Sequence, residues 1–235
     1  ERAAARGVTL NFSITTNGCM GQTLAATASC MVSVRFNPTS AGTKTASLTV
    51  TGTPGGSVTA SLNGMGLSPP SLLVSPGTQN FGDVITGNSS TQVFTLTNAG
   101  GVASGVPSAS LGGADMAMFS VSSNTCTTGL APAASCMIGV RFQPSSTGAK
   151  VGTLNISATP GGSALAMLSG NGIPPSALTF TPANLDLGSQ LQNTSGTAMR
   201  LTVTNTGGAA SGAVTVALAG TAAGEFAITA QTCNG

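Results

Sequence analysis

Two closely spaced pairs of cysteines are the residues of this 235-residue chain best suited to chemistry. The residue numbers differ by 11 for Cys19 and Cys30 and by 10 for Cys126 and Cys136, so each pair brackets a turn between two predicted strands. Thiols that meet across such a hairpin form a disulfide in an oxidising compartment, and a loop this short adds about 3 kcal/mol or less. We favour this interpretation over two free buried thiols.

A metal site is the third interpretation of these cysteines. Zinc sites need three or four ligands, and each pair supplies only two because the chain contains no histidine and no carboxylate near the pairs. The sequence therefore predicts no metal and no cofactor.

Charged residues are too few and too scattered for most catalytic chemistry. The chain has 7 Lys+Arg, 5 Asp+Glu and no His, which excludes an imidazole base. No Gly-x-Ser-x-Gly nucleophile motif occurs. The acidic residues are far apart in the sequence; they are Glu1, Asp83, Asp115, Asp186 and Glu225. We therefore expect no enzymatic activity.

Composition also bears on the partners. A net charge of +2 cannot neutralise a nucleic-acid footprint, so we expect no nucleic-acid partner. The mean hydropathy is +0.32, yet no apolar run is long enough to span a bilayer, so we expect no membrane insertion within this segment. Residues 1–15 lack the apolar region of a signal peptide, so signal and anchor are expected outside this segment.

The cysteines belong to an internal repeat. Cys19, Cys126 and Cys233 follow one another at a constant spacing of 107, and residues 30–38 recur as 136–144 at a shift of 106. One unit of about 106 residues is therefore repeated. Cys233 corresponds to Cys19 and Cys126, so it is the first member of a third pair. Its partner is expected beyond residue 235, and we therefore predict that Cys233 is unpaired by truncation.

Pro-Pro steps mark the boundaries between units, because consecutive prolines make a short, stiff, extended connector. They divide the chain into the C-terminal part of one unit (1–68), a complete unit (69–173) and the N-terminal part of a third (174–235). The chain is then either a segment of a longer polypeptide or a subunit whose two partial units complete each other.

Alternating apolar and polar residues predict half-buried antiparallel strands within the unit. Ile138, Val140 and Phe142, for example, share one face of such a strand. The strands predicted for the complete unit are 71–75, 80–85, 90–98, 106–111, 117–123, 136–143, 150–158 and 163–170. This pattern, with turn residues between the strands, predicts an all-β fold of tandem immunoglobulin-like sandwiches.

The order of the motifs resembles a known family. Phe81-Gly82-Asp83-Val84, the strand 94–100, the cysteine strand 136–144 and the terminal Gly170-Asn171-Gly172 resemble the abnormal-spindle and hydin type of immunoglobulin-like domain. More narrowly, they are similar to bacterial choice-of-anchor D surface proteins. The resemblance implies a non-catalytic, extracellular or cell-surface repeat. The third unit departs from it at Leu187, which replaces the aromatic Phe81, and Phe180 offers a replacement ring.

Two classes of function remain open. The first is a structural module of an extracellular stalk, sheath or filament, whose partners are neighbouring repeats or copies of itself, assembled head-to-tail by strand complementation. The second is an adhesion module that recognises a protein or surface glycan through loops 100–108 or 124–135. Arg35 with Lys44, repeated as Arg141 with Lys150, is either a cation ladder for an anionic polysaccharide or a solvated face.

Overall fold

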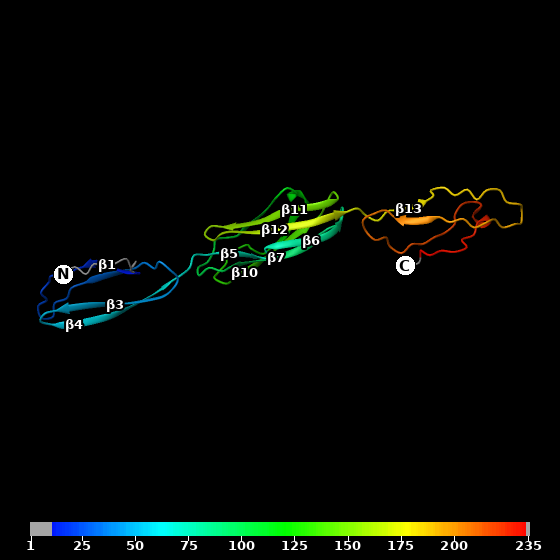
Figure 1. The fold of residues 1–235 in the computed structure, drawn as a ribbon. Coiled ribbons are helices and arrows are strands. Elements are labelled where there is room, and N and C mark those ends of the chain that lie inside the picture. Colours follow the sequence, from blue (N-terminus) through cyan, green and yellow to red (C-terminus); the bar gives the residue numbers. More distant parts are fainter. Residues whose placement is uncertain (1–10, 234–235) are drawn as a thin grey trace.

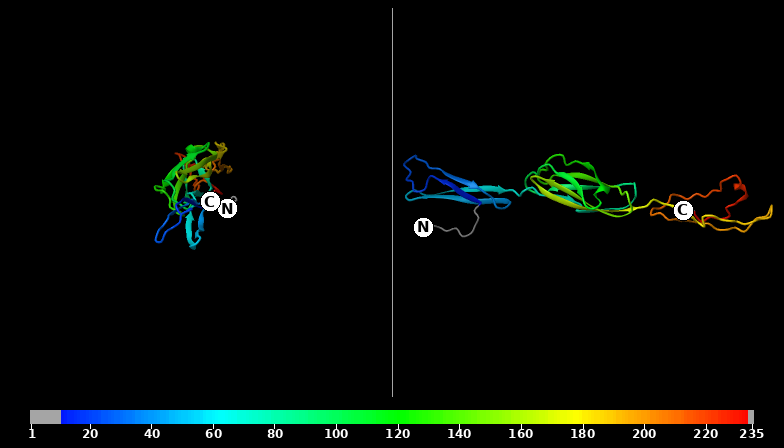
Figure 2. Two further views of the ribbon diagram at one scale, coloured as in Figure 1. Left: turned by 90° about the vertical axis from the view of Figure 1, so that its left-hand side faces the viewer. Right: turned by 90° about the horizontal axis from the view of Figure 1, so that it is seen from above.

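The computed structural model describes residues 11–233, which form three parts in a row (Figure 1). The first part lies at one end, the last part at the other, and the view from above agrees (Figure 2). Among the described residues there is no α-helix, only two short 3-10 turns, η1 (Met116–Met118) and η2 (Ala223–Glu225). No helix in that range is long and apolar enough to cross a membrane. The predicted all-β class is confirmed.

The middle part is a sandwich of two four-stranded sheets. One sheet has the order β5-β7-β10-β9 and the other β6-β12-β11-β8. All pairings are antiparallel except β6 with β12. The strands are β5 (Leu72–Ser75), β6 (Thr78–Ile85), β7 (Ser90–Asn98), β8 (Ser108–Gly112), β9 (Phe119–Asn124), β10 (Ser135–Phe142), β11 (Gly148–Ala158) and β12 (Gly162–Ile173). This is an immunoglobulin-like sandwich.

The core of this sandwich consists of the side chains predicted to face inward. Ile138, Val140 and Phe142 are at most 1% exposed, whereas Met137, which precedes them on the opposite face of the strand, is 56% exposed. Three Phe rings pack together at one end of the core, with centroids 5.7 Å apart for Phe81 with Phe119 and 4.9 Å apart for Phe119 with Phe142. Burial of alternate side chains from both sheets supplies the main stabilisation.

The Gly-x-Gly motif at the end of the unit is a packing feature. A Cβ atom at Gly170 would lie 2.5 Å from the Phe142 ring, and one at Gly172 would lie 3.0 Å from Pro144. Both glycines are therefore needed so that β12 can approach the end of β10. The first unit repeats the arrangement, because a Cβ at Gly64 would lie 2.7 Å from Phe36.

The first part contains two separate hairpins. β1 pairs with β2, and β3 pairs with β4. The strands are β1 (Phe12–Asn17), β2 (Val32–Phe36), β3 (Gly42–Gly52) and β4 (Gly56–Gly66). When the repeat shift of 106 or 107 is applied, they are the counterparts of β9, β10, β11 and β12, so this part is the second half of a sandwich.

The third part is the first half of a sandwich. β13 (Leu178–Thr181) pairs with β14 (Thr202–Asn205), and these strands are the counterparts of β5 and β7. The counterparts of β6 and β8, near residues 184–191 and 215–219, do not form strands. Phe180 lies at the position of Val74 in the unit before and lines a hollow with Val203 and Val216.

Candidate functional site

Both predicted disulfides are present in the structure. Cys126, which follows β9, is bonded to Cys136 at the start of β10 with a Cα–Cα distance of 5.2 Å, and both residues are buried. Cys19 and Cys30 bridge β1 and β2 at the same Cα–Cα distance and are half-buried. Cys233 is free and half-buried. Because disulfides persist in oxidising compartments, the two bridges indicate an extracellular or secreted protein.

Three aspartates accept hydrogen bonds, two of them from the backbone. Asp115 Oδ2 accepts a hydrogen bond from the Val151 N–H at 2.9 Å, and Asp186 Oδ1 accepts one from the Gly188 N–H at 2.8 Å. Asp83 Oδ1 accepts one from Asn171 Nδ2. Within residues 11–233, no three His, Cys, Asp or Glu side chains gather as metal ligands would.

The repeated cations do not share one face. Arg141 lies on β10 and Lys150 on β11, which belong to different sheets of the sandwich. Lys150 Nζ donates a hydrogen bond to the Thr147 carbonyl at 3.1 Å, and Lys44 Nζ donates one to the Ala41 carbonyl at the same distance. Each lysine therefore makes its hydrogen bond within the adjacent turn. The arginine and the lysine of the middle unit do not form a continuous ladder on one sheet.

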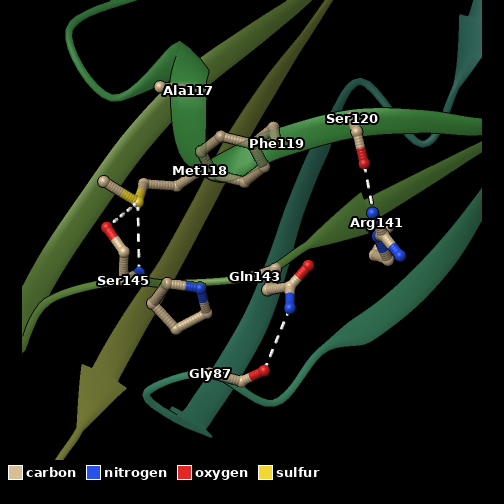
Figure 3. A pocket seen from close by; sticks show the side chains of 9 residues that line it. Gly87, Ala117, Met118, Phe119, Ser120, Arg141, Gln143 and Ser145 are labelled. Carbon is tan, nitrogen blue, oxygen red and sulfur yellow. Dashed lines mark hydrogen bonds between the residues drawn. The ribbon is translucent and has the colours of Figure 1, made fainter.

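A shallow hollow of about 240 Å³ lies beside η1 and the end of β10 (Figure 3). Arg141 Nε donates a hydrogen bond to Ser120 Oγ at 3.3 Å, and Gln143 Nε2 donates one to the Gly87 carbonyl at 3.0 Å. Ser145 directs its Oγ to the Met118 sulfur, also at 3.3 Å. The hollow holds no nucleophile paired with a base, so it offers no catalytic constellation.

The junction before the middle sandwich contains a buried polar network. Asn98, at the end of β7, is fully buried and makes four side-chain hydrogen bonds. Its Oδ1 accepts the Ser71 and Gly100 N–H groups at 3.0 Å each. Its Nδ2 donates to the Val102 and Leu130 carbonyls at 2.8 and 2.9 Å. One side chain thus fastens the incoming linker to the sandwich and to two of its loops.

The glycines after Asn98 let the linker lie directly on this turn. A Cβ at Gly100 would lie 2.5 Å from the Pro70 Cα, and Gly101 donates its N–H to the Ser68 carbonyl at 3.1 Å. Ala99 donates its N–H to the Ser71 carbonyl at 2.8 Å. The Pro-Pro connector is therefore docked on the sandwich and is not a free spacer.

The next junction repeats the same contacts. Asn205 Oδ1 accepts the Ala177 and Gly207 N–H groups at 3.0 Å each, and its Nδ2 donates to the Ala209 carbonyl at 2.8 Å. A Cβ at Gly208 would lie 2.5 Å from Pro174 Cδ. We refer to the Asn-x-Gly-Gly turn with its docked Pro-Pro linker as the joint.

The two loops predicted for ligand recognition are built into this end of the sandwich. Ser104 Oγ accepts the Leu130 N–H at 3.0 Å, and the Ser104 N–H donates to the Leu130 carbonyl at 2.9 Å. Ser104 and Leu130 are both buried. Loops 100–108 and 124–135 are thus tied to each other and to Asn98.

The sequence analysis did not identify Asn98 and the glycines after it as a site. The signal was present in the spacing, because residues 96–101 correspond to 203–208 at a shift of 107, and each set begins fewer than 30 residues after a Pro-Pro step. The partner of Asn98 is the linker 27 residues earlier. Only the pairing of β5 with β7 brings these two segments together.

No family model and no curated protein matches the chain. Among solved structures, it is similar to the secreted serine protease VesC from Vibrio cholerae, at 23% identity over 42% of this chain, with a TM-score of 0.35. This match spans only 22% of VesC. An ASH/PapD-like domain of human CEP192 is 16% identical over 46% of this chain and 88% of that domain, with a TM-score of 0.33.

A protein of unknown function from Porphyromonas gingivalis is 10% identical over 72% of this chain and 83% of its own length, with a TM-score of 0.37. Because these TM-scores are low, the immunoglobulin-like fold is assigned from the strand order of the middle sandwich and not from these matches.

Proposed function

We propose that this protein is a non-catalytic structural module in which tandem immunoglobulin-like units form an extracellular stalk, sheath or filament at the cell surface. The observation that carries the proposal is the joint. Asn98 and Asn205 hold successive linkers with the same two backbone contacts at the same distances. Equivalent joints set successive units at equivalent orientations, which is the requirement for a regular extended array.

The short connector supports this proposal. β4 ends at Gly66 and β5 begins at Leu72, and most of the residues between them contact the Asn98 turn. A connector of this kind has little freedom, because prolines restrict its backbone and the docked N–H and carbonyl groups fix its direction. The resemblance to choice-of-anchor D surface proteins agrees with such a role.

Small-angle X-ray scattering of the full chain at low concentration tests the proposal. A compact globule of this length has a radius of gyration of about 18 Å. We expect a much larger value and the cross-section of a single sandwich, as in the row of parts in Figure 1. A radius near that of the globule would refute the rod.

A matched pair of variants tests the joint itself. Gly100→Val places a branched side chain against Pro70, whereas a Cβ at Gly77 meets no atom within 4 Å. We expect Gly100→Val to shorten the maximum dimension by loosening the angle between units and Gly77→Val to leave it unchanged. Equal profiles for both variants would show that the joint does not set the shape.

A further inference from the structure

The Cys126–Cys136 disulfide closes a loop that belongs to the joint. Residues 127–135 connect β9 to β10, and the bridge ties the two ends of this loop together. Leu130 is buried near the middle of the loop, whereas its neighbours on both sides are exposed. The loop is therefore held by the bridge at its ends, by Leu130 at its centre and by its hydrogen bonds to the joint.

Three hydrogen bonds connect this loop to Asn98. Asn98 Nδ2 donates to the Leu130 carbonyl at 2.9 Å. The Asn98 N–H donates to the Ala134 carbonyl at 3.0 Å, and the Asn98 carbonyl accepts the Ala133 N–H at 2.9 Å. The other end of the side-chain amide, Oδ1, accepts the Ser71 N–H of the linker at 3.0 Å. One residue therefore transmits the position of the loop to the linker.

Leu130 also fixes the loop to Ser104. The Leu130 carbonyl accepts a second hydrogen bond, from the Ser104 N–H at 2.9 Å, and the Leu130 N–H donates to Ser104 Oγ at 3.0 Å. Gly129 lies so close to the Ser104 carbonyl that a Cβ atom there would collide with it. Hydrogen bonds weaken steeply when their angle changes, so all these contacts depend on one placement of the loop backbone.

The loop backbone does not favour this placement by itself. Ala133 has a φ of 61°, a left-handed conformation that is unfavourable for a residue with a Cβ atom. Its N–H is the group that binds the Asn98 carbonyl. The disulfide opposes a change of conformation, because joining the ends of a loop removes many of the alternatives open to it.

The strands that carry the bridge have further contacts with each other. Thr125 donates its N–H to the Met137 carbonyl at 2.9 Å, and the Met137 N–H donates to Thr125 Oγ1 at 2.8 Å. Beyond this point β9 and β10 pair from Ile138 to Phe142. We therefore expect that opening the bridge frees the loop and leaves the sandwich folded.

We propose that the Cys126–Cys136 disulfide and loop 127–135 form a redox-sensitive latch of the joint. With the bridge closed, the loop holds Asn98 and Asn98 holds the linker. With the bridge open, the loop leaves Asn98 and the linker is released. The linker connects the first part to the middle sandwich in Figure 1, so its release frees the angle between them. The inference rests on the proposed structural function and adds a means of regulating it.

A dithiol reductant opens the latch by thiol–disulfide exchange. Its thiolate attacks one sulfur of the bridge and forms a mixed disulfide, which releases the other cysteine. The second thiol of the reductant then displaces the protein. The protein gains two electrons and two protons as two thiols, and the reductant leaves as a cyclic disulfide. Cys126 and Cys136 are 3% and 8% exposed, so this attack requires local opening of the loop.

A matched pair of double variants of the full chain tests the latch, both in a Cys233→Ser background. Cys126→Ala with Cys136→Ala removes the bridge of the joint. Cys19→Ala with Cys30→Ala removes a bridge with the same Cα–Cα distance of 5.2 Å. The loop closed by this second bridge makes no hydrogen bond to either linker within residues 11–233, so it serves as the control.

Amide hydrogen exchange, resolved by residue with nuclear magnetic resonance, is the measurement. Asn98 Oδ1 accepts the N–H groups of Ser71 and Gly100, and these two amides report directly on the joint. We expect both to exchange at least about tenfold faster in the first variant and at an unchanged rate in the control. The Ile138 N–H, in the middle of β10, should keep its protection in both variants.

The outcomes divide as follows for the latch. Faster exchange at Ser71 and Gly100 in the first variant alone supports it. Unchanged exchange there, or equal acceleration in the control, overturns it. Faster exchange at Ile138 as well also overturns it, because the bridge would then support the whole sandwich. Dithiothreitol must produce the same acceleration in the Cys233→Ser protein, and reoxidation must reverse it; otherwise the latch is not redox-sensitive and the inference fails.

Small-angle scattering of the oxidised protein keeps the two proposals apart. An extended protein whose Ser71 and Gly100 amides do not respond to the bridge leaves the stalk intact and removes the latch. A compact protein whose amides do respond removes the stalk and leaves the latch.

Discussion

The middle sandwich and the two end parts have the same sequence pattern but very different burial. Phe119 is 5% exposed in the middle unit, and its counterpart Phe226 is 52% exposed in the third part. Phe94 is fully buried, whereas its counterpart Leu201 is 42% exposed. Alternation of apolar residues selects the inner face of a strand, but a second sheet is needed to bury that face.

Local features persist where burial is lost. Asn80 Oδ1 accepts the Gly82 N–H at 2.9 Å in β6, and Asp186 Oδ1 accepts the Gly188 N–H at 2.8 Å although no strand forms there. The two glycines have φ values of 73° and 72°. Turns of this kind depend on neighbouring residues only, whereas strands depend on distant partners.

The largest expected difference between the regions concerns the aromatic core. Phe142→Ala removes a fully buried ring and should destabilise the middle unit by about 4 kcal/mol. Phe36→Ala removes the half-buried counterpart in the first part and should cost about 1 kcal/mol. Hydrogen exchange resolved along the chain measures both losses. Equal losses in a monomeric sample would show that the end part is as well packed as the middle unit.

The next difference concerns the joints. Asn98→Ala leaves two N–H groups and two carbonyls without their buried partner, and we expect a loss of about 3 kcal/mol. Asn205→Ala acts on an exposed residue and should cost about 1 kcal/mol. Denaturant unfolding followed by far-ultraviolet circular dichroism gives both values. A larger loss of unfolding free energy for Asn205→Ala than for Asn98→Ala would contradict the assignment of the Asn98 joint as the better buried of the two.

The smallest difference concerns the glycines beneath the aromatic rings. Gly170→Ala forces a Cβ against the enclosed Phe142 ring and should cost about 2 kcal/mol. Gly64→Ala meets the Phe36 ring, which is half-buried and free to shift, and should cost less than about 1 kcal/mol. Thermal unfolding of the two variants compares them. An unchanged unfolding temperature for Gly170→Ala would show that the Phe142 ring can shift as easily as the half-buried Phe36 ring.

Much of the middle unit was predictable from the sequence. Each predicted strand overlaps a strand of the structure, and 90–98 matches β7 at both ends, because alternation and turn residues are local signals. Ile138, Val140 and Phe142, which were predicted to share one face of a strand, are buried in the core together with Phe81, Phe94 and Phe119.

Two features were beyond such reasoning. The parallel pairing of β6 with β12 joins strands from opposite ends of the unit and leaves no local trace. The four hydrogen bonds of Asn98 reach linker and loop backbone, which no motif specifies. The suggestion that Phe180 supplies the ring missing at Leu187 stays a prediction; Phe180 lies on β13 at the place of Val74 and lines a hollow with Val203.

The Cys126–Cys136 disulfide has a consequence under tension. An array pulled from its ends lengthens as each sandwich unravels, and an extended chain gains about 3.4 Å per residue. The disulfide closes a loop with a sequence separation of 10, so it withholds about 30 Å of the middle unit from that extension. Force–extension curves of the oxidised protein should therefore show a shorter step for the middle unit than those of the reduced protein, by about this amount.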